Sequence, residues 1–543
     1  MQHQRVNRLI PVLLVAVSSL SAGLSAHAQL QARQQLLVDI TVEGLSIDKL
    51  DMLRHLFTSE GFNRLLTQGA VLTDVDFGTP LDPVAANAVL HTGAAPAVNG
   101  IATATLYEPL THRAVPVFNS NTPTAADESY SPSRLLASTL ADELKIDASG
   151  LNRVHSIAPS ASMAIAAGGH TPNSVYWIND VSGKWTTSTY YQDRPVFLQY
   201  RNRMRPVSAT LDTMVWRPSL PVAEYVDLSE VMRLYPFSIR FPYGETNRYI
   251  KYKSSPLVNT EVTQVAAEYL RNLEPVKDNA PDMLSIAYTL QPYNSSNPTD
   301  QKIQQQDAYI RLDHDIAALL KAIDEGPGLQ NTLVVVSGTP EAPYARKDDD
   351  KWRLPVGEFS PRKAISLLNL YLINKFGNGE WATGFHNGYF YLNPNTVSEH
   401  HADIDLVRTE AARFLRRMSG VTEAYTIDEI LEGKTRHKGE AEARNTRHDA
   451  AGDIRLNVAP GWVIASDDNN NADNLPAMAQ RGVSTTAPVL IMAPGIAPQT
   501  ISTPVDARAI APTIASILRI RAPNGAQLPP IRLKRELTQE TKQ

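Results

Sequence analysis

The chain has 543 residues, of which 43% are hydrophobic and 20% charged, and this composition excludes a disordered or fibrous protein. The formal net charge of −5 gives no indication that the protein binds nucleic acid. Because the chain contains no cysteine, disulfides, thiolate catalysis, Cys-ligated zinc, iron–sulfur clusters and lipoprotein anchoring are excluded.

The first 28 residues have the pattern of a secretory signal peptide. Two arginines precede an apolar stretch over residues 9–24, and Ala26-His27-Ala28 fits a small-x-small cleavage site. A membrane anchor is the alternative, but Pro11 interrupts an apolar part that is shorter than the roughly 20 residues a span needs. We therefore predict a periplasmic or secreted protein, cleaved near Ala28 and without a membrane span.

The rest of the chain alternates apolar runs with helical patterns. Residues 35–45 predict a buried parallel strand, and Ser46 is the expected N-cap of the helix that follows. The later predictions, in chain order, are a helix end and a strand over 61–77, a short helix over 82–96, strands over 161–169 and 282–290, an amphipathic helix over 307–326, and strands over 331–338 and 487–495. This alternation predicts an α/β fold, a doubly wound and mostly parallel sheet with helices on both faces.

Two regions break this rhythm. Residues 171–275 are rich in Tyr, Trp, Arg and Pro, and residues 341–476 mix short strands with polar loops. We predict that both are insertions that fold onto the sheet of a single domain spanning residues 33–530. A polar tail over residues 531–543 is expected to fray.

Six segments follow one another in an order that resembles a known enzyme superfamily. They are VEGLSIDKL, LHTGAAPAVNGI, AAGGHTPNSVYWINDVSGKWTTSTYY, DAYIRLDHDIAALLKAID, AGDIRLNVAPGW and DARAIAPTIASILRI. Together they resemble the type I phosphodiesterase/nucleotide pyrophosphatase branch of the alkaline phosphatase superfamily, and most of all its secreted bacterial phosphatases with a Thr nucleophile. The resemblance, from about Gln35 to about Pro523, implies an alkaline-phosphatase-like fold and phosphoryl transfer assisted by two zinc ions.

The resemblance also places the metal ligands, and most of them are replaced. Of the six positions only the first holds a side chain that binds metal, and the six are Glu43, Pro292, Ser296, Thr339, Pro340 and Ala477. No histidine follows His448, so no shift of the alignment restores the last imidazole. Active members would use two zinc ions, whereas for this chain we predict no metal and no other cofactor.

The positions that act on phosphate in the family are replaced as well. The nucleophilic Thr falls on Pro83, and the Asn that holds a phosphate oxygen falls on Ala104. The Lys and Arg of the phosphate clamp fall on Ser160 and Ser162. We predict that the chain has kept the fold and lost the catalyst, since fold and function are separable.

No other motif supplies a replacement site. The chain has no G-x-S-x-G elbow, H-E-x-x-H pair or P-loop lysine. The histidines and their neighbours have structural interpretations: a hydrogen-bonding role for His170, a packed or surface position on a helix for His91, a solvated helix start for His400 and Asp403, and polar loops for His437 and His448.

Three functions remain open. The first is a pseudoenzyme that binds or scaffolds a protein partner in the cell envelope, with residue types in the first insertion that favour interfaces; these are Trp177, Trp185, Tyr190, Tyr191, Arg201, Arg203, Arg205, Trp216 and Arg217. The second is a metal-dependent phosphomonoesterase or phosphodiesterase with a rebuilt site around Glu43. The third is a metal-free binder of a small anion or sugar, with Ser160, Ser162, Thr103 and Thr105 as hydrogen-bond donors.

Overall fold

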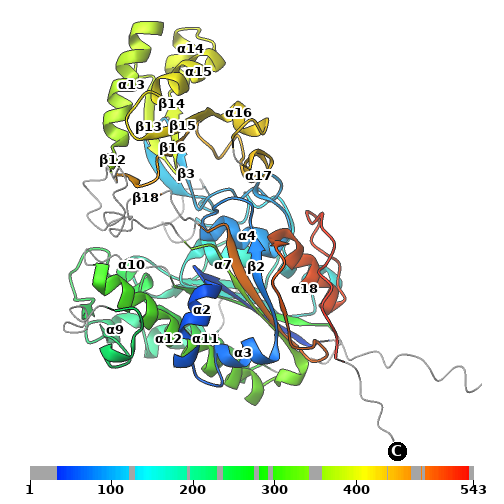
Figure 1. The fold of residues 1–543 in the computed structure, drawn as a ribbon. Coiled ribbons are helices and arrows are strands. Elements are labelled where there is room, and N and C mark those ends of the chain that lie inside the picture. Colours follow the sequence, from blue (N-terminus) through cyan, green and yellow to red (C-terminus); the bar gives the residue numbers. More distant parts are fainter. Residues whose placement is uncertain are drawn as a thin grey trace, which may run out of the picture. The chain divides into compact units, whose positions relative to one another are not determined.

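A ten-stranded sheet forms the centre of the fold, in the order β20–β2–β19–β11–β1–β10–β5–β6–β7, with β21 beside β2 (Figure 1). The strands are β1 (Leu36–Glu43), β2 (Ala70–Asp76), β5 (Val154–Ala158), β6 (Ser174–Ile178), β7 (Trp185–Thr186), β10 (Asp282–Thr289), β11 (Thr332–Gly338), β19 (Thr486–Met492), β20 (Gln499–Ile501) and β21 (Val505–Asp506). The run from β11 through β1, β10 and β5 to β6 is parallel, and β19 is antiparallel to both of its neighbours. The predicted doubly wound, mostly parallel sheet is confirmed.

The computed structural model describes residues 34–120, 129–191, 196–228, 237–273, 280–290, 298–341, 357–436, 438–465, 478–479 and 484–536. Contacts within Gln34–Gln543 group this part of the chain into one compact unit. The predicted signal peptide, the site positions Pro292, Ser296 and Ala477, and the loop histidine His437 lie outside the described residues.

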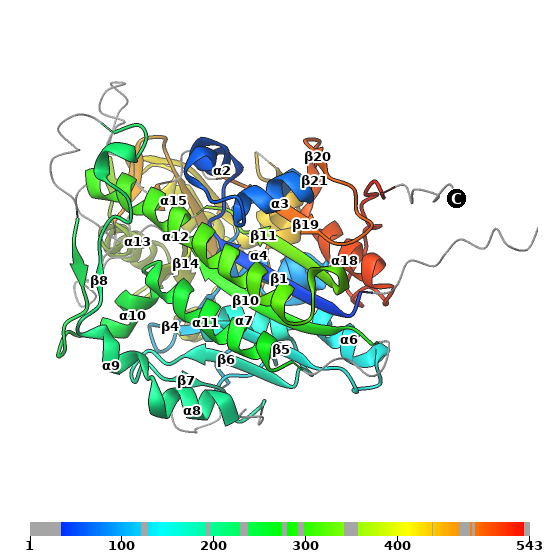
Figure 2. The same ribbon diagram turned by 90° about the horizontal axis from the view of Figure 1, so that it is seen from below.

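Alternate side chains of β1 divide the helices between the two faces of the sheet, because successive residues of a strand point to opposite sides. Leu36, Val38 and Ile40 pack in a core with α2, α3, α11 and α12 (Figure 2), whereas Leu37 packs with α4, α6 and α18. These helices, with α7 beside α4, are α2 (Ile47–Leu53), α3 (Phe62–Gln68), α4 (Pro83–Thr92), α6 (Leu140–Asp147), α7 (Ala161–Gly168), α11 (Leu257–Arg271), α12 (Pro298–Glu325) and α18 (Ile510–Leu518).

One predicted strand is a helix. Residues 161–169 were expected to extend, but they form α7, whose N-cap Ser160 accepts a hydrogen bond from the Met163 amide. A short apolar run fits a buried strand and a buried helix equally well, and here alanine, the best helix former, fills four of eight positions.

The first insertion is smaller than predicted. Both β6 and α11 lie inside residues 171–275, yet they belong to the central sheet and to the helix layer that covers it. The remaining elements are α8 (Val196–Met204), α9 (Val207–Leu211), β8 (Val215–Trp216), β9 (Ile239–Arg240) and α10 (Arg248–Lys253).

The second insertion forms what we call the cap, the described residues between 357 and 479, and it has a hydrophobic core of its own. Its strands are β12 (Gly357–Phe359), β13 (Ala382–His386), β14 (Tyr389–Leu392), β15 (Val421–Thr426), β16 (Ile454–Val458), β17 (Trp462–Ile464) and β18 (Met478–Ala479). Its helices are α13 (Pro361–Phe376), α14 (Pro394–Glu399), α15 (Ile404–Leu415), α16 (Ile427–Leu431) and α17 (Gly439–Asn445). Apart from the helix start at His400 and Asp403, the sequence predicted only short strands and loops here, so most of these helices were not predicted.

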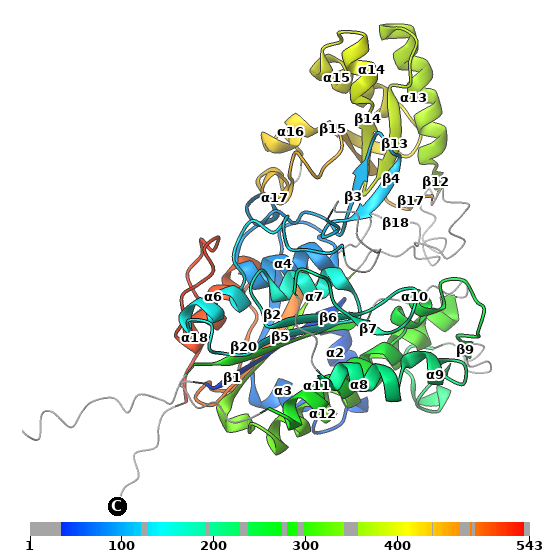
Figure 3. The ribbon, with the colours of Figure 1, turned by 180° about the vertical axis from the view of Figure 1, so that it is seen from behind.

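A hairpin from the main body joins the cap. After α5 (Pro96–Asn99), strands β3 (Thr105–Glu108) and β4 (Arg113–Pro116) pair and lie beside β13 (Figure 3). The Tyr107 hydroxyl donates to the Thr383 carbonyl at 3.0 Å, and the Thr105 hydroxyl bonds the His386 ring at 2.8 Å.

The described part of the C-terminus is hydrogen-bonded to the body. The Ile531 amide donates to the Thr513 hydroxyl at 2.8 Å, and the Glu536 amide donates to the Gly495 carbonyl at 3.1 Å. Residues 531–536, which the sequence analysis assigns to the fraying tail, are thus tied down. None of the helices in the described part of the chain has the length and apolar character that crossing a bilayer requires.

Candidate functional site

The carboxyl ends of β1, β10 and β11 meet at one edge of the sheet, because the three strands are parallel and in register. Glu43 lies opposite Thr289, and Thr339 follows the last residue of β11. The Glu43 carboxyl is hydrogen-bonded by the Thr289 hydroxyl. The fold therefore brings the first predicted ligand position close to Thr339 and Pro340, two of the replaced ones.

Thr339 has a structural partner at this edge. It is fully buried, and its hydroxyl accepts a hydrogen bond from the Gly44 amide at 3.2 Å. The hydroxyl therefore holds the turn after β1.

Glu43 is the one acidic side chain among the predicted ligand positions, and its surroundings disfavour its charge. The pKa of Glu43 is raised to about 7, chiefly by burial. The Thr289 hydroxyl and Lys253 oppose the rise, and the nearby Asp82 carboxylate adds to it. Lys253 comes from α10 in the first insertion and is paired with Asp180.

Pro83 and Ala104 are brought together by Asp82, a residue that the sequence analysis did not single out. One Asp82 oxygen accepts hydrogen bonds from the Val84 and Ala85 amides, both at 2.9 Å, and the other accepts from the Ala104 amide at 2.7 Å. Asp82 is the N-cap of α4 and Pro83 its first residue. The Asp-Pro pair at a helix start was the signal available in the sequence.

The two clamp positions lie at the start of α7, directly after β5 and hence at the same sheet edge. Ser160 caps this helix, and Ser162 occupies its first turn. Two small hydroxyls therefore stand where the family's Lys and Arg would hold a phosphate, and they supply no positive charge.

The residues present do not match a two-zinc site. Among the residues that the structure describes, no group of three or more His, Asp or Glu side chains lies close enough to hold a metal ion. A tetrahedral zinc needs three or four such ligands, so we derive no chemical step through a metal.

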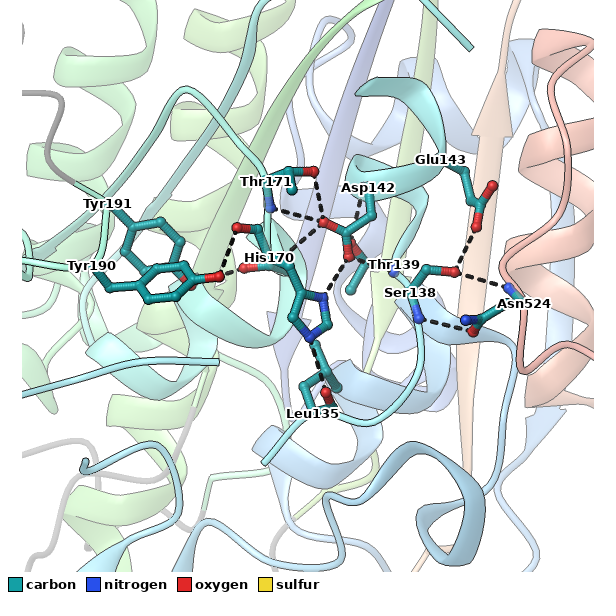
Figure 4. A network of polar contacts seen from close by, with 11 residues as sticks. Leu135, Ser138, Thr139, Asp142, Glu143, His170, Thr171, Tyr190, Tyr191 and Asn524 are labelled. Atoms are coloured by element: carbon teal, nitrogen blue, oxygen red, sulfur yellow. Dashed lines mark hydrogen bonds and ion pairs between the residues drawn. The ribbon is translucent and has the colours of Figure 1, made fainter. Parts of the chain in front are cut away.

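His170 has the structural role that its position suggested (Figure 4). Its Nδ1 bonds the Asp142 carboxylate at 2.9 Å, and its Nε2 bonds the Leu135 carbonyl at 2.9 Å. Both ring nitrogens face acceptors, and the bond to Asp142 raises the pKa of His170 although burial opposes the rise. The same carboxylate accepts the His170 and Thr171 amides, so it fixes the turn that leads into β6.

The other histidines do not gather at the sheet edge. His91 is buried under the middle of β1, with its Nε2 2.8 Å from the Asp39 carboxylate. His400 ends α14 and bonds the Asn378 carbonyl, whereas Asp403 caps α15, so these two do not form a shared site.

A cavity of about 170 Å³ lies where the sheet edge meets the cap. Its lining includes Asp82 and Thr103 from the main body and Asn387, Glu442 and Arg455 from the cap. The Thr103 hydroxyl already accepts a hydrogen bond from the Asn387 amide, and Thr105 bonds His386. Thr103 and Thr105, which were predicted to donate hydrogen bonds to a small ligand, are therefore hydrogen-bonded to residues of the cap.

Most interface-type residues of the first insertion pack inward. Trp177, Trp185, Tyr191, Arg201 and Trp216 are buried, and Arg201 pairs with Glu261 at 2.7 Å. The exposed members of the set are Tyr190, Arg203, Arg205 and Arg217. A partner surface on this insertion would therefore be mainly basic.

Comparison with known proteins identifies relatives along nearly the whole chain. It is 26% identical over 516 residues to a protein named calcium-transporting ATPase from Myroides odoratus, which covers 91% of this chain and 93% of the relative. It is 24% identical over 519 residues to alkaline phosphatase PafA from Elizabethkingia meningoseptica, covering 92% and 94%.

The fold matches a solved structure of the same kind. A crystal structure of a quadruple mutant of alkaline phosphatase PafA superposes with a TM-score of 0.78 at 24% identity, covering 92% of this chain and 98% of that one. This likeness confirms the alkaline-phosphatase-like fold.

The prediction that the chain carries no cofactor is contradicted by these comparisons. Its relatives over nine-tenths of the chain include two proteins named alkaline phosphatase, PafA and PhoV, which are metal-dependent enzymes. Replacement of the expected zinc ligands does not rescue the prediction, because other residues could still bind a metal.

The family itself follows from a match over most of the chain. Residues 37–484 match the family model described as type I phosphodiesterase/nucleotide pyrophosphatase. This range includes the sheet edge with Glu43, the start of α4, and the cap. The chain belongs to the type I phosphodiesterase/nucleotide pyrophosphatase family of the alkaline phosphatase superfamily.

Proposed function

We propose that the protein is a pseudoenzyme of its family that does not hydrolyse phosphate esters and acts as a binding or scaffold protein in the cell envelope. The observation that carries the proposal is Pro83 at the first position of α4. The family's nucleophilic hydroxyl belongs there, and a proline ring offers no lone pair for attack on phosphorus.

The neighbours of Pro83 support the same proposal. Asp82 carries a carboxylate, but its two oxygens accept three backbone amides and so cap the helix. Ala104, Ser160 and Ser162 remove the polar and cationic groups that would neutralise charge on a transferring phosphoryl group. These positions support the proposal that the nucleophile and its electrostatic support have been lost together.

The proposed location rests on the N-terminal pattern. Residues 1–28 have the charge, apolar stretch and cleavage motif of a signal peptide. Export predicts that mass spectrometry of the purified envelope protein finds a mature N-terminus near Gln29. A full-length chain that retains Met1 in the cytoplasm would contradict it.

The test of the proposal is a hydrolysis assay on the mature protein supplied with zinc, using a generic phosphate monoester and a diester. We expect no turnover above the buffer rate, both for the natural chain and for Pro83→Ala. Turnover that a chelator abolishes would overturn the proposal. Metal content measured on the same sample is a separate result, because a bound ion without turnover is compatible with a binding role.

A metal-dependent phosphatase with a rebuilt site is the second candidate, favoured by relatives named alkaline phosphatase over nine-tenths of the chain. In that case Glu43 is the side chain to test. Chelator-sensitive turnover that Glu43→Gln reduces at least tenfold, while the exposed Glu60→Gln leaves it unchanged, would establish this candidate.

A further inference from the structure

A second cavity lies between the cap and the hairpin β3–β4, and neither Glu43 nor Pro83 lines it. It has a volume of about 620 Å³, within the range of about 300–1,000 Å³ typical of small-molecule pockets. The hairpin β3–β4, strand β14, the α14–α15 connection and residues 448–453 surround it. We call it the cap pocket, and its main polar and aromatic lining is Tyr107, Tyr391, His401, Arg408, His448 and Asp453.

Two tyrosines form an aromatic wall of the cap pocket. The rings of Tyr107 and Tyr391 lie with centroids 4.6 Å apart, tilted by 46°. Tyr107 packs against Gly384, where there is no room for a β-carbon, so its ring is held in place. Tyr391 is only 5% exposed, and its hydroxyl has no hydrogen-bond partner among the described residues. A tyrosine hydroxyl can both donate and accept, so this group is available to a ligand in the pocket.

The Arg408 guanidinium in the lining is already paired, because it faces the carboxylates of Asp453, Asp428 and Asp405. Arg408 Nε donates to Asp453 at 2.9 Å, and the other Asp453 oxygen accepts the Leu392 amide at 2.7 Å. Asp449 forms a two-point pair with Arg447, at 2.7 and 2.6 Å. An anionic ligand would therefore meet no unpaired cation among these groups.

The mouth of the pocket adds groups that both donate and accept. His401 and His448 are exposed, and within the described part of the chain their rings make no hydrogen bond. A neutral imidazole offers one donor and one acceptor. Aliphatic side chains such as Val397 and Ile404 lie beside these polar groups, so a purely apolar ligand would leave the polar groups unpaired.

We infer that the cap pocket binds a neutral, hydroxyl-rich molecule of the size of a mono- or disaccharide. Tyrosine faces pack against the C–H groups of such a ring, while the free Tyr391 hydroxyl, the two imidazoles and the spare carboxylate lone pairs bond its hydroxyls. The inference goes beyond the proposed function, because the pocket shares none of the positions that decide hydrolysis.

Isothermal titration of the full mature protein with maltose, cellobiose, N,N′-diacetylchitobiose and myo-inositol tests the inference. We expect saturable binding of at least one of these probes. Tyr391→Phe removes one hydrogen bond and should weaken that binding about three- to tenfold. His448→Ala, at the exposed mouth, provides a second variant that leaves the cap core intact and should weaken binding by a similar factor.

Tyr269→Phe is the matched control, because the Tyr269 hydroxyl on α11 is also buried without a partner among the described residues, but lies outside the pocket. It should leave the affinity unchanged. No saturable binding of any of the four probes would overturn the inference. So would binding that both pocket variants leave unchanged, or saturable binding of benzoate or benzylamine in place of the neutral probes. None of these results bears on the hydrolysis assay, so the two proposals fail separately.

Discussion

Asp82 and Pro83 stabilise the start of α4, as its N-cap and its first residue. Proline at the first helical position loses no hydrogen bond, and an aspartate N-cap satisfies amides that would otherwise lack partners. Both residues therefore stabilise α4 at the position where the resemblance predicts a reactive hydroxyl. Thr339, a predicted ligand position, also has a structural partner, because its hydroxyl accepts a hydrogen bond from the Gly44 amide.

A second residue-scale feature is the buried pair of His91 and Asp39. His91 donates from Nδ1 to the Asn87 carbonyl at 2.9 Å and faces Asp39 with Nε2 at 2.8 Å. Burial lowers the pKa of His91, but the Asp39 carboxylate outweighs it and holds this pKa above the ordinary value. The pair links α4 to the middle of β1.

We predict that His91→Gln lowers the free energy of unfolding by about 3 kcal/mol at pH 6, because removing one partner leaves a buried charge unpaired. Because the pKa of His91 is higher in the folded than in the unfolded protein, protonated His91 stabilises the fold. This contribution is complete below the unfolded-state pKa of about 6.5, and it is lost as the pH rises through the folded-state pKa. The cost of the substitution should therefore shrink at higher pH, which urea unfolding at pH 6 and pH 9 measures. The exposed His55→Gln is the control, and an equal cost for His91→Gln at both pH values would contradict the assignment.

Asp307 is the anchor through which the first insertion attaches to α12. Its carboxylate accepts hydrogen bonds from Trp216 Nε1 at 2.6 Å, from the Ser219 amide at 2.6 Å, and from the Tyr225 hydroxyl at 2.8 Å. Arg311, one turn along α12, adds an ion pair at 2.7 Å. One helix residue thereby fixes a segment about 90 positions earlier in the chain.

We predict that Asp307→Asn loosens this segment without unfolding the sheet. Hydrogen bonds to a charged group are worth about 1.5–3 kcal/mol each, so losing the charge should raise amide exchange over residues 215–228 at least tenfold. Hydrogen-exchange mass spectrometry should show no change in β1 and β10. Asp324→Asn, exposed on the same helix, should match the natural chain, and equal acceleration throughout the protein would refute local anchoring.

At the scale of the whole molecule, the cap has its own sheet, its own helices and a separate hydrophobic core. Contacts such as Tyr107 to Thr383 attach it to the hairpin β3–β4. Because this core is separate from that of the main sheet, we expect the cap to unfold as a separate cooperative unit.

We predict that Leu368→Ala, at a fully buried position of α13, destabilises the cap by about 2–5 kcal/mol and leaves the main sheet intact. Leu370→Ala on the same helix removes the same atoms from a side chain that is 65% exposed, and it should change stability by less than about 0.5 kcal/mol. Amide exchange measured separately for α13 and β10 distinguishes the two regions. Faster exchange in β10 as well would mean that the two cores unfold together.

The fold class was predictable because runs such as 35–45 and 331–338 are apolar throughout, which suits strands buried on both faces. The helices of the cap could not be predicted in the same way, because their apolar faces complete a core made with strands that follow much later in the chain. Residues 161–169 were assigned to a strand because a run of small apolar residues carries no period that separates strand from helix.

The sequence by itself determined which chemical groups are present: proline at the nucleophile position, serines at the clamp, and one carboxylate among the six ligand positions. Only the tertiary structure decided what the remaining groups do, because hydrogen-bond partners come from segments distant in sequence. It made Asp82 a cap that joins Pro83 to Ala104, and it made Thr103 and Thr105 supports of the cap. It also enclosed the cap pocket, since its two tyrosines stand 284 positions apart and meet only when the hairpin β3–β4 packs on β14.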